Sequence, residues 1–343
     1  MGIKNLNSFL KKHCPSVFKH VELSSYKGKT LAIDISLYLF KYKALYGDKW
    51  LSAFVNLICV LKKNRINCVF VYDNGAPPEK KEEQDSRRDQ RDKLKNKIEQ
   101  LQLDIRNYES NNVITQLLRD VSDKSEKEKK RLLLMGKSSN INIRYVKGYL
   151  EKIKKQCISI CEDDFKTTRQ LFDAMSIPYL IAKEEAEAYC ANLCVNGIVA
   201  GVVSEDTDVL TYNTPRFITN LDVSKQTCIQ LNIDDILQGL SITYEQFRDL
   251  CIMFGTDYNK NIKGVGPETT YKLITEHKSI DNLPEKYDKS ILNHERSREL
   301  FTTDKTLDID IPTSGEPDWS ALQEVLFKNN CKFDMNYIKQ CIK

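Results

Sequence analysis

Three segments of the chain run apolar and β-branched and then reach aspartate, at residues 31–34, 69–73 and 199–208. Short continuous apolar runs of this kind are typical of buried strands in a parallel sheet. Ligands of open α/β sheets bind at the carboxyl ends of the strands. If the strands are parallel neighbours, the aspartates at their ends converge on one edge of the sheet; they are Asp34, Asp73, Asp206 and Asp208.

This group of carboxylates predicts a metal site. Like charges gathered in one place raise each other's pKa, so a divalent cation is the usual remedy. Oxygen-only ligation suits Mg²⁺ or Mn²⁺. Glu185 and Glu187 stand at the expected start of a helix that follows a strand at 177–181, and they add to the cluster, although acids at that position also serve as simple helix caps. The chain therefore suggests a metal-dependent enzyme acting on an anionic substrate.

A second candidate site is the glycine-containing turn at 262–267, which precedes a helix expected at 269–276. Gly264 and Gly266 would let the backbone approach a phosphate closely, and the helix N-terminus would supply N–H donors. Such a helical hairpin grips a nucleic-acid backbone without reading bases. A plain turn between helices is about as good an interpretation of Gly-x-Gly alone.

The composition bounds the class of protein. The chain has 343 residues, 41% hydrophobic and 29% charged, which allows a large core. No apolar stretch reaches the ~20 residues of a membrane span, and the N-terminus lacks the apolar core of a signal peptide. The eleven cysteines are scattered without CxxC pairs, which favours reduced, buried thiols in an intracellular protein over structural zinc.

Positive charge is concentrated in one segment. The net charge of the chain is +4, whereas residues 124–155 hold 11 Lys or Arg against 3 Glu, leaving the remainder net negative. A basic segment beside an acidic centre fits a polyanion held by phosphate contacts, while a solvated helix face is the alternative for any isolated charge run. The candidate phosphate contacts in this segment are Lys127, Lys129, Lys130 and Arg131.

The α/β pattern is interrupted by a long, charged, aromatic-poor stretch with alternating signs, as on exposed long helices. We therefore predict a helical excursion out of the sheet. The expected divisions are an N-terminal part of a core at 1–78, a helical insertion at 79–170, an internal part of the core at 171–240, and a helical region at 241–343 that holds the glycine-containing turn and the C-terminal helices.

Taken together, the motifs resemble the flap endonuclease family, the XPG/Rad2-like structure-specific 5′ nucleases. The resemblance spans nearly the whole chain, and several motifs in family order are more specific than any one of them. They are MGIKNL at the start, AIDIS at 32–36, VFVYDNGAPP at 69–78, PYLIAKEEAEAYCA at 178–191, VVSEDTDVLTY at 202–212, DLCIMFGTDY at 249–258, IKGVGP at 262–267 and EPDWS at 316–320.

The resemblance implies a PIN-like, mostly parallel α/β sheet flanked by helices, with a helical arch insertion and a helix–two-turn–helix DNA-binding motif. It places the metal-binding carboxylates on seven residues, of which Asp34, Asp73, Glu185 and Asp208 also act in catalysis: Asp34, Asp73, Glu185, Glu187, Asp206, Asp208 and Asp257. The family's basic pair at the scissile phosphate falls on Lys81 and Arg88. Further DNA contacts fall on Gly2, on Phe40 as a ring that stacks on a base, and on Lys263, Gly264 and Gly266.

The chain also departs from the family pattern. The connection from Asp34 to Asp73 is shorter than in eukaryotic flap endonucleases, and the missing stretch includes the acidic loop that holds a 3′-flap nucleotide. The excursion at 79–170 is longer than usual. Asn261 stands where relatives often have Ser, in the turn whose carbonyls bind a monovalent cation. No sliding-clamp peptide is evident at the C-terminus.

These features predict a 5′ nuclease, with flap endonuclease and 5′-3′ exonuclease activity on DNA in replication and repair. Two Mg²⁺ ions (or Mn²⁺) and a K⁺ ion at the helix–two-turn–helix turn are the expected cofactors. The expected partner is branched or flapped DNA, with no membrane, for a monomer in the nucleus or, if viral, at a cytoplasmic replication site. The alternatives are a processive 5′ exonuclease on DNA or RNA, and a non-catalytic junction-binding scaffold, which would need lost carboxylates.

Overall fold

The computed structural model describes residues 2–130, 141–304, 309–312 and 315–342, with the side chains of 124–130 left out. The chain divides into two compact units. One, here called the core, comprises Met1–Lys81 and Cys161–Lys343; the other, here called the cap, comprises Glu82–Ile160.

The core is built on a seven-stranded mixed sheet with the order β1-β7-β6-β5-β2-β3-β4. Strands β6, β5, β2, β3 and β4 run parallel to one another, and β7 pairs antiparallel with both β6 and β1. The strands are β1 Lys19–Glu22, β2 Thr30–Asp34, β3 Asn67–Tyr72, β4 Tyr179–Ile181, β5 Gly201–Val203, β6 Arg216–Asp222 and β7 Thr227–Asn232.

The central strands are apolar on both faces because helices cover both. Within β2 and β3, only the first residue of each strand is not buried. Register pairs Ile33 with both Phe70 and Val203, so the carboxyl ends of β5, β2 and β3 are level. The acidic residues that follow these strands therefore meet at one edge, as the sequence pattern predicts.

The helices of the core follow in chain order. They are α1 Leu6–His13, α2 Ile35–Tyr46, α3 Trp50–Lys63, α7 Glu162–Ala174, α8 Ala186–Val195, α9 Ile233–Leu240, α10 Tyr244–Phe254, α11 Pro267–His277, α12 His294–Leu300, α13 Trp319–Lys328 and α14 Met335–Ile342. Short 3₁₀ segments are η1 Pro15–Val17, η2 Leu23–Tyr26, η3 Gly47–Lys49, η4 Pro78–Lys80, η5 Thr207–Tyr212, η6 Ile280–Asn282 and η7 Ser290–Leu292.

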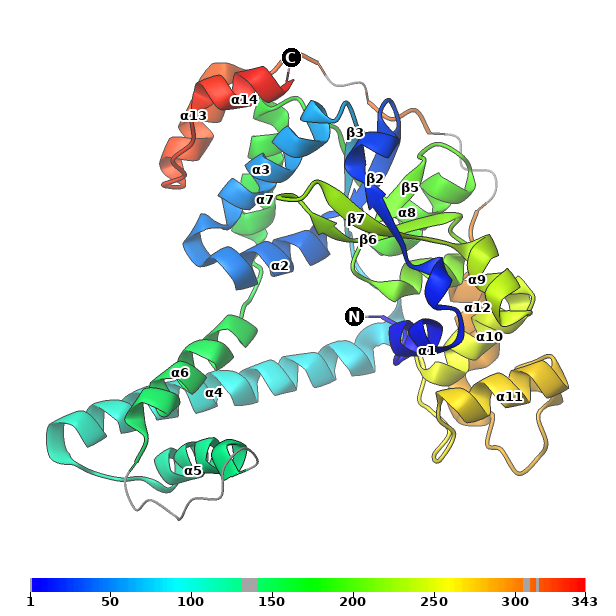
Figure 1. Ribbon diagram of the computed structural model, residues 1–343, viewed down its shortest axis with the longest axis horizontal. Helices are drawn as coiled ribbons and strands as arrows, with labels where there is room; N and C mark the ends of the chain where they lie inside the picture. The colour runs from blue at the N-terminus through cyan, green and yellow to red at the C-terminus, as the bar shows by residue number, and fades with distance from the viewer. Residues whose placement is uncertain (1, 131–140, 305–308, 313–314, 343) are drawn as a thin grey trace. The chain divides into compact units, whose positions relative to one another are not determined.

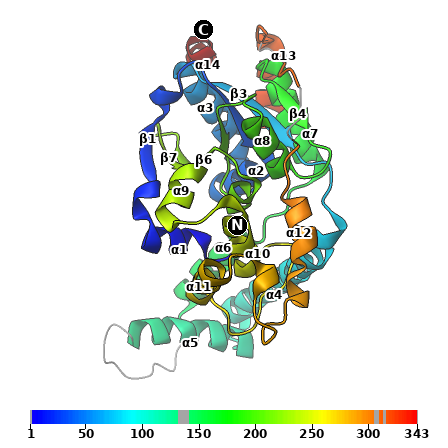
Figure 2. The ribbon, with the colours of Figure 1, turned by 90° about the vertical axis from the view of Figure 1, so that its right-hand side faces the viewer.

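Two layers of helices enclose the sheet. Helices α2, α3 and α7 lie on one side of the strands and α8 on the other, and the C-terminal helices α13 and α14 pack on α7 and α3 (Figure 1). Helices α1, α10 and α11 lie together at one end of the core, with α11 in contact with both of the others (Figure 2). This arrangement confirms the expected PIN-like α/β class.

The cap has a small apolar core of its own. Its helices are α4 Lys81–Asn111, whose first residue belongs to the core, α5 Gln116–Lys130 and α6 Ile143–Gln156. All three contribute buried side chains to one cluster: Ile98, Leu101, Ile105, Leu118, Val121, Val146, Leu150 and Ile153. Buried Asp104 accepts a hydrogen bond from Thr115 Oγ1 at 2.6 Å and so ties α4 to the start of α5.

Several elements differ from the expectation. The sequence pattern does not predict β1 or the β6–β7 hairpin, because alternating burial is a weaker signal than a continuous apolar run. The segment at 199–208 is a strand only at Gly201–Val203.

Ile35–Lys63 meets a membrane-span criterion by length and composition, but half of its apolar window is buried in the core, where it forms α2 and α3.

Candidate active site

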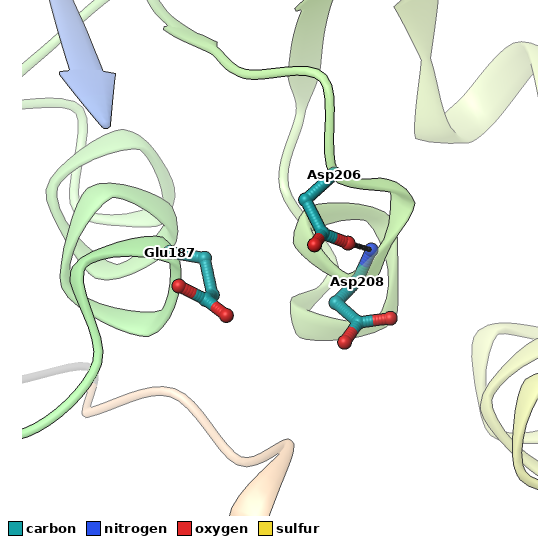
Figure 3. A group of neighbouring side chains, drawn as sticks. All are labelled: Glu187, Asp206 and Asp208. Carbon is teal, nitrogen blue, oxygen red and sulfur yellow. Dashed lines mark hydrogen bonds between the residues drawn. The ribbon is translucent and has the colours of Figure 1, made fainter. Parts of the chain in front are cut away.

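Glu187, Asp206 and Asp208 form the centre of the site. Each offers a carboxylate oxygen, and these oxygens all lie within 4.8 Å of one another. All three residues are buried, with exposed fractions of 8%, 9% and 2%. Figure 3 shows Glu187 approaching from its helix while the two aspartates face it from the segment that follows β5. Three buried carboxylates in this geometry form a candidate site for a divalent cation.

Asp206 and Asp208 meet for a reason that differs from the expected one. The apolar run at 199–208 suggests that both lie at the end of a strand, but β5 ends at Val203 and both aspartates lie beyond it. Asp206 caps the 3₁₀ segment η5, and its Oδ1 accepts the N–H of Asp208 at 3.0 Å. Ser204 Oγ in turn accepts the N–H of Asp206 at 3.0 Å. The tight turn, rather than strand pleating, brings both carboxylates toward Glu187.

Four further carboxylates were expected at this edge, and hydrogen bonds or ion pairs bring each into the same region. Asp34 N-caps α2, accepting the N–H of Ser36 at 2.9 Å. The Ser36 hydroxyl donates to Asp73, whose other oxygen accepts the N–H of Ala186 at 2.7 Å, at the start of the helix that carries Glu187. These bonds join the ends of β2, β3 and β4.

Glu185 and Asp257 reach the group through a lysine. The Lys80 ammonium donates to Glu185 and lies 3.5 Å from Glu187 Oε1 and 3.4 Å from Asp257 Oδ2. The hydroxyl of Tyr258 donates to the other oxygen of Glu185. Tyr258 and Glu185 are both buried, so this bond holds the Glu185 carboxylate in one orientation.

Burial and mutual repulsion disfavour ionisation of the cluster. Burial, followed by the charges of Glu187, Asp73 and Asp206, raises the pKa of Asp34 well above its ordinary value. Burial and the charge of Asp206 do the same to the pKa of Asp208. Burial also raises the pKa of Glu187 to about 8, although Lys80 opposes the shift. A bound cation would reverse these shifts.

The donor set fits a hard divalent cation. It consists of carboxylate oxygens alone, and one of them, Asp208 Oδ1, is buried without a hydrogen-bond partner in the part of the chain that the structure describes. An orphaned buried acceptor is costly unless a cation or donor reaches it. Mg²⁺ or Mn²⁺ would satisfy this oxygen, and the residues named above would hold it.

The sequence pattern does not single out Lys80, which contacts three carboxylates of the cluster. Burial disfavours its charged form, but the charges of Glu187, Glu185 and Asp257 outweigh that effect and raise the pKa of Lys80 above its ordinary value. Its side chain is only 12% exposed. The expected residue, Lys81, is exposed at the first position of α4, and Arg88 pairs with Asp85 at 2.9 Å on the exposed surface of the cap. Lysines next to acidic residues are common on exposed helices. The adjacent Lys80 and Lys81 therefore give no sequence signal of which side chain points toward the cluster.

Gly2 packs directly against the cluster. Its φ of +88° is a conformation that L side chains rarely adopt, and a Cβ there would lie 2.1 Å from Asp206 Oδ1 and 2.7 Å from Thr207 Oγ1. Only glycine therefore allows the N-terminal segment to approach this carboxylate.

The other predicted contacts lie elsewhere on the chain. Phe40 is 39% exposed on α2. Lys263 is exposed between α10 and α11, Gly264 has a φ of +80°, and Gly266 N-caps α11. The side chains of Lys127, Lys129 and Lys130, and all of Arg131, lie outside the described residues.

We predict that metal activation depends on pH through Glu187. Because its pKa is raised to about 8, a proton competes with the cation below that pH, and the carboxylate becomes available as pH rises. As pH rises from about 6.5 to about 8.5, the Mg²⁺ concentration needed for half-maximal activity should decrease, by up to about tenfold per pH unit if one proton is released. Glu187→Gln should flatten this slope, whereas Glu184→Gln, the same change at an exposed neighbour, should leave it unchanged. If Glu187→Gln keeps the wild-type dependence of the Mg²⁺ requirement on pH, Glu187 is not the group responsible for it.

Comparisons with known proteins agree with this geometry. Residues 1–94 match the XPG N-terminal domain and residues 176–257 match the XPG I-region. A probable RAD2-like endonuclease of Invertebrate iridescent virus 3 is 35% identical, over 90% of this chain and 87% of its own length. A flap endonuclease 1 of Lodderomyces elongisporus is 31% identical, over 96% of this chain and 83% of its own length.

Solved structures share the fold. The catalytic core of Rad2 in complex with DNA substrate superposes with a TM-score of 0.65 at 19% identity, covering 99% of each chain. Flap endonuclease-1 from Methanococcus jannaschii gives a TM-score of 0.61 at 21% identity, covering 95% of this chain and 94% of that one. At these identities the likeness establishes the arrangement of the sheet and its helices.

Proposed function

This chain belongs to the XPG/Rad2-like family of flap endonucleases, and from that premise we propose that it is a metal-dependent, structure-specific 5′ nuclease that cuts DNA at single-strand/duplex junctions. The observation that carries the proposal is the buried group of Glu187, Asp206 and Asp208, whose oxygens lie within 4.8 Å of one another at the carboxyl edge of the sheet. Its oxygen-only donors suit phosphodiester hydrolysis with Mg²⁺.

In the proposed mechanism the chain's own residues hold and orient the reacting groups. The seven carboxylates would hold two Mg²⁺ ions, which supply an activated water and stabilise the leaving oxygen when bound. Asp206 and Asp208 stay oriented by the η5 turn, and the Tyr258 hydroxyl holds Glu185. Lys80 sits at the cluster as a preorganised positive charge, which would stabilise charge that develops on the scissile phosphate.

The basic pair is accordingly proposed one residue earlier than the sequence analysis placed it. Arg87 follows Lys80 by the same seven residues that separate Lys81 from Arg88. Lys80 contacts the carboxylates whereas Lys81 is exposed. We therefore assign the role of the pair to Lys80 and Arg87.

Substrate contacts complete the proposal. Duplex DNA would lie on the turn of Lys263, Gly264 and Gly266, where a helix N-terminus offers N–H donors to phosphate. Phe40 would stack on a base beside the cut, and the N-terminal segment at Gly2 would line the substrate path. The basic segment of the cap that begins at Lys124 would hold the single-stranded 5′ end.

We further propose that the protein works as a monomer on branched DNA in replication and repair. By family membership the site of action is the nucleus, or a cytoplasmic replication site if the chain is viral. The rival activity is processive 5′ exonuclease digestion of DNA or RNA. A non-catalytic scaffold is disfavoured because all seven carboxylates are present.

One panel of substrates tests the function. End-labelled flap, nicked, gapped and recessed DNA, with an RNA counterpart of the flap, would be incubated with Mg²⁺ and the products sized. The proposal expects a single cut near the junction of the flap. A ladder of mononucleotides from every 5′ end would favour the exonuclease, and binding without cleavage would favour the scaffold.

We predict no strong preference for a double flap. The connection from α2 to α3 is the three-residue 3₁₀ segment Gly47–Lys49, which leaves no loop to enclose a 3′-flap nucleotide. Preference requires differential binding, so kcat/KM should be similar for single- and double-flap DNA. Exposed Tyr46 and half-buried Trp50 flank the connection and offer the only stacking groups there among the described residues. A preference for the double flap of about tenfold or more, ~1.4 kcal/mol, would show that these rings rebuild the pocket.

A further inference from the structure

The carboxylates of the proposed site form two groups that share Glu187. In the first group, Glu187 faces Asp206 and Asp208, with oxygens that all lie within 4.8 Å of one another. In the second group, Glu187 lies with Glu185 and Asp257 around one lysine ammonium. Two adjacent groups of oxygen donors with a shared member suit a pair of divalent cations.

The two groups differ in what their oxygens contact. Asp208 Oδ1, in the first group, is buried and has no hydrogen-bond partner among the residues that the structure describes. In the second group, the Lys80 ammonium donates to Glu185. The same ammonium lies 3.5 Å from Glu187 Oε1 and 3.4 Å from Asp257 Oδ2. Because an ammonium has three donors, one lysine can serve all three acids. The first group therefore leaves an oxygen for a metal ion, whereas the second already contains a cation of its own.

Neighbouring contacts hold Lys80 in this position. Its backbone N–H donates to the carbonyl of Pro77 at 3.0 Å, at the η4 turn. The preceding residue, Glu79, accepts a hydrogen bond from Arg296 Nε at 2.7 Å, which ties the turn to α12. The Lys80 side chain is only 12% exposed, so its ammonium has carboxylates in place of most of its water. The turn thus directs the ammonium into the acidic group without help from a metal or DNA.

An ammonium and a divalent cation cannot share the oxygens of the second group. Mg²⁺ binds oxygen ligands at about 2.0–2.1 Å. An ion at that distance from Glu185 and Glu187 would meet the like charge of Lys80 at close range. The lysine stem is flexible, so the ammonium can leave, but it then gives up three carboxylates. Binding of a metal ion to the second group is therefore an exchange of one cation for another.

We propose that Lys80 occupies the place of the second divalent cation in the free protein, so that the chain without DNA binds one metal ion rather than two. The first ion binds to Glu187, Asp206 and Asp208, and the second enters only in exchange for the lysine ammonium. The inference rests on the proposed function as a two-metal nuclease. It is compatible with the proposed role of Lys80 at the scissile phosphate, because a phosphate offers the ammonium another anionic partner.

The test counts the Mn²⁺ ions that the DNA-free protein binds at constant pH and ionic strength. Isothermal titration calorimetry and the electron paramagnetic resonance signal of unbound Mn²⁺ give two independent counts. The wild type should bind one ion per chain, with any second ion at least about tenfold weaker because of the lysine charge. Lys80→Met retains most of the side-chain volume but removes the ammonium. This variant should bind two ions per chain, the second at least about tenfold more tightly than the wild type does.

Two controls separate the charge of Lys80 from its position. Lys81→Met makes the same change at the exposed neighbouring lysine, and Lys80→Arg keeps a positive charge at residue 80. Both variants should bind one ion, as the wild type does.

Two ions of similar affinity in the wild type would overturn the inference, as would a count of one in folded Lys80→Met. If Lys80→Met fails to fold, Lys80→Gln, which can still donate a hydrogen bond to a carboxylate, must bind the second ion. A wild type that binds one ion but does not cleave flap DNA in Mg²⁺ would instead refute the proposed function.

Discussion

Replacing Asp206 by Asn is expected to lower the single-turnover rate of flap cleavage by about 10³-fold or more, ~4 kcal/mol of transition-state stabilisation. The substitution retains the size of the side chain but removes one of the three carboxylates whose oxygens converge within 4.8 Å. DNA affinity should change little, since phosphate contacts are proposed on the cap and on the α10–α11 turn. Asp34→Asn should behave in the same way. The measurements are quenched-flow cleavage and fluorescence anisotropy with the same labelled flap.

The matched control is Asp222→Asn, the same chemical change at a partly exposed residue at the end of β6, whose carboxylate accepts local bonds from Ser224 and Lys225. It should retain wild-type turnover. Near-normal cleavage by Asp206→Asn in Mg²⁺ would contradict the assignment of the metal site to these carboxylates.

Lys80→Ala is expected to lower kcat by about 10²–10³-fold, the usual cost of removing one preorganised charge from the site where charge develops. Lys80 touches Glu185, Glu187 and Asp257, and these carboxylates raise its pKa, so it remains charged throughout the working pH range. Substrate KM should rise less than kcat falls, since one charge among many phosphate contacts contributes modestly to binding.

Lys81→Ala tests the neighbouring alternative that the sequence motif favoured. Its side chain is exposed and no ion pair to it is found among the described residues, so its removal should reduce kcat by less than about fivefold. Equal losses of kcat in Lys80→Ala and Lys81→Ala would mean that the contact of Lys80 with the carboxylates has only a structural role. A larger loss in Lys81→Ala would restore the sequence-based assignment.

The sheet and its acidic edge follow from the sequence because each rests on a local pattern with a strong physical cause. Continuous apolar runs at β2 and β3 can only be buried, and parallel strands necessarily bring Asp34 and Asp73 to the same edge. Glu187 was found by the same argument through β4. Asp257 has no such strand signal, and only the family resemblance pointed to it.

Side-chain detail escaped sequence reasoning where it depends on tertiary contacts. Which of two adjacent lysines turns inward depends on the η4 turn at Pro78–Lys80, and the pairing of Asp206 with Asp208 depends on a 3₁₀ segment that an aspartate-rich strand end does not announce. The amide of Asn261 reaches carbonyls seven and eight residues earlier, a contact that only the folded turn creates.

The most direct test of a carboxylate-bound metal centre is single-turnover cleavage of one end-labelled flap across a range of Mg²⁺ concentrations, for the wild type and Glu187→Gln. The structure predicts no cleavage in a chelator, a saturable rise with Mg²⁺ in the wild type, and a requirement for at least about tenfold more Mg²⁺ after loss of one buried carboxylate ligand. Cleavage that persists in the chelator, or an unchanged Mg²⁺ requirement in Glu187→Gln, would contradict it.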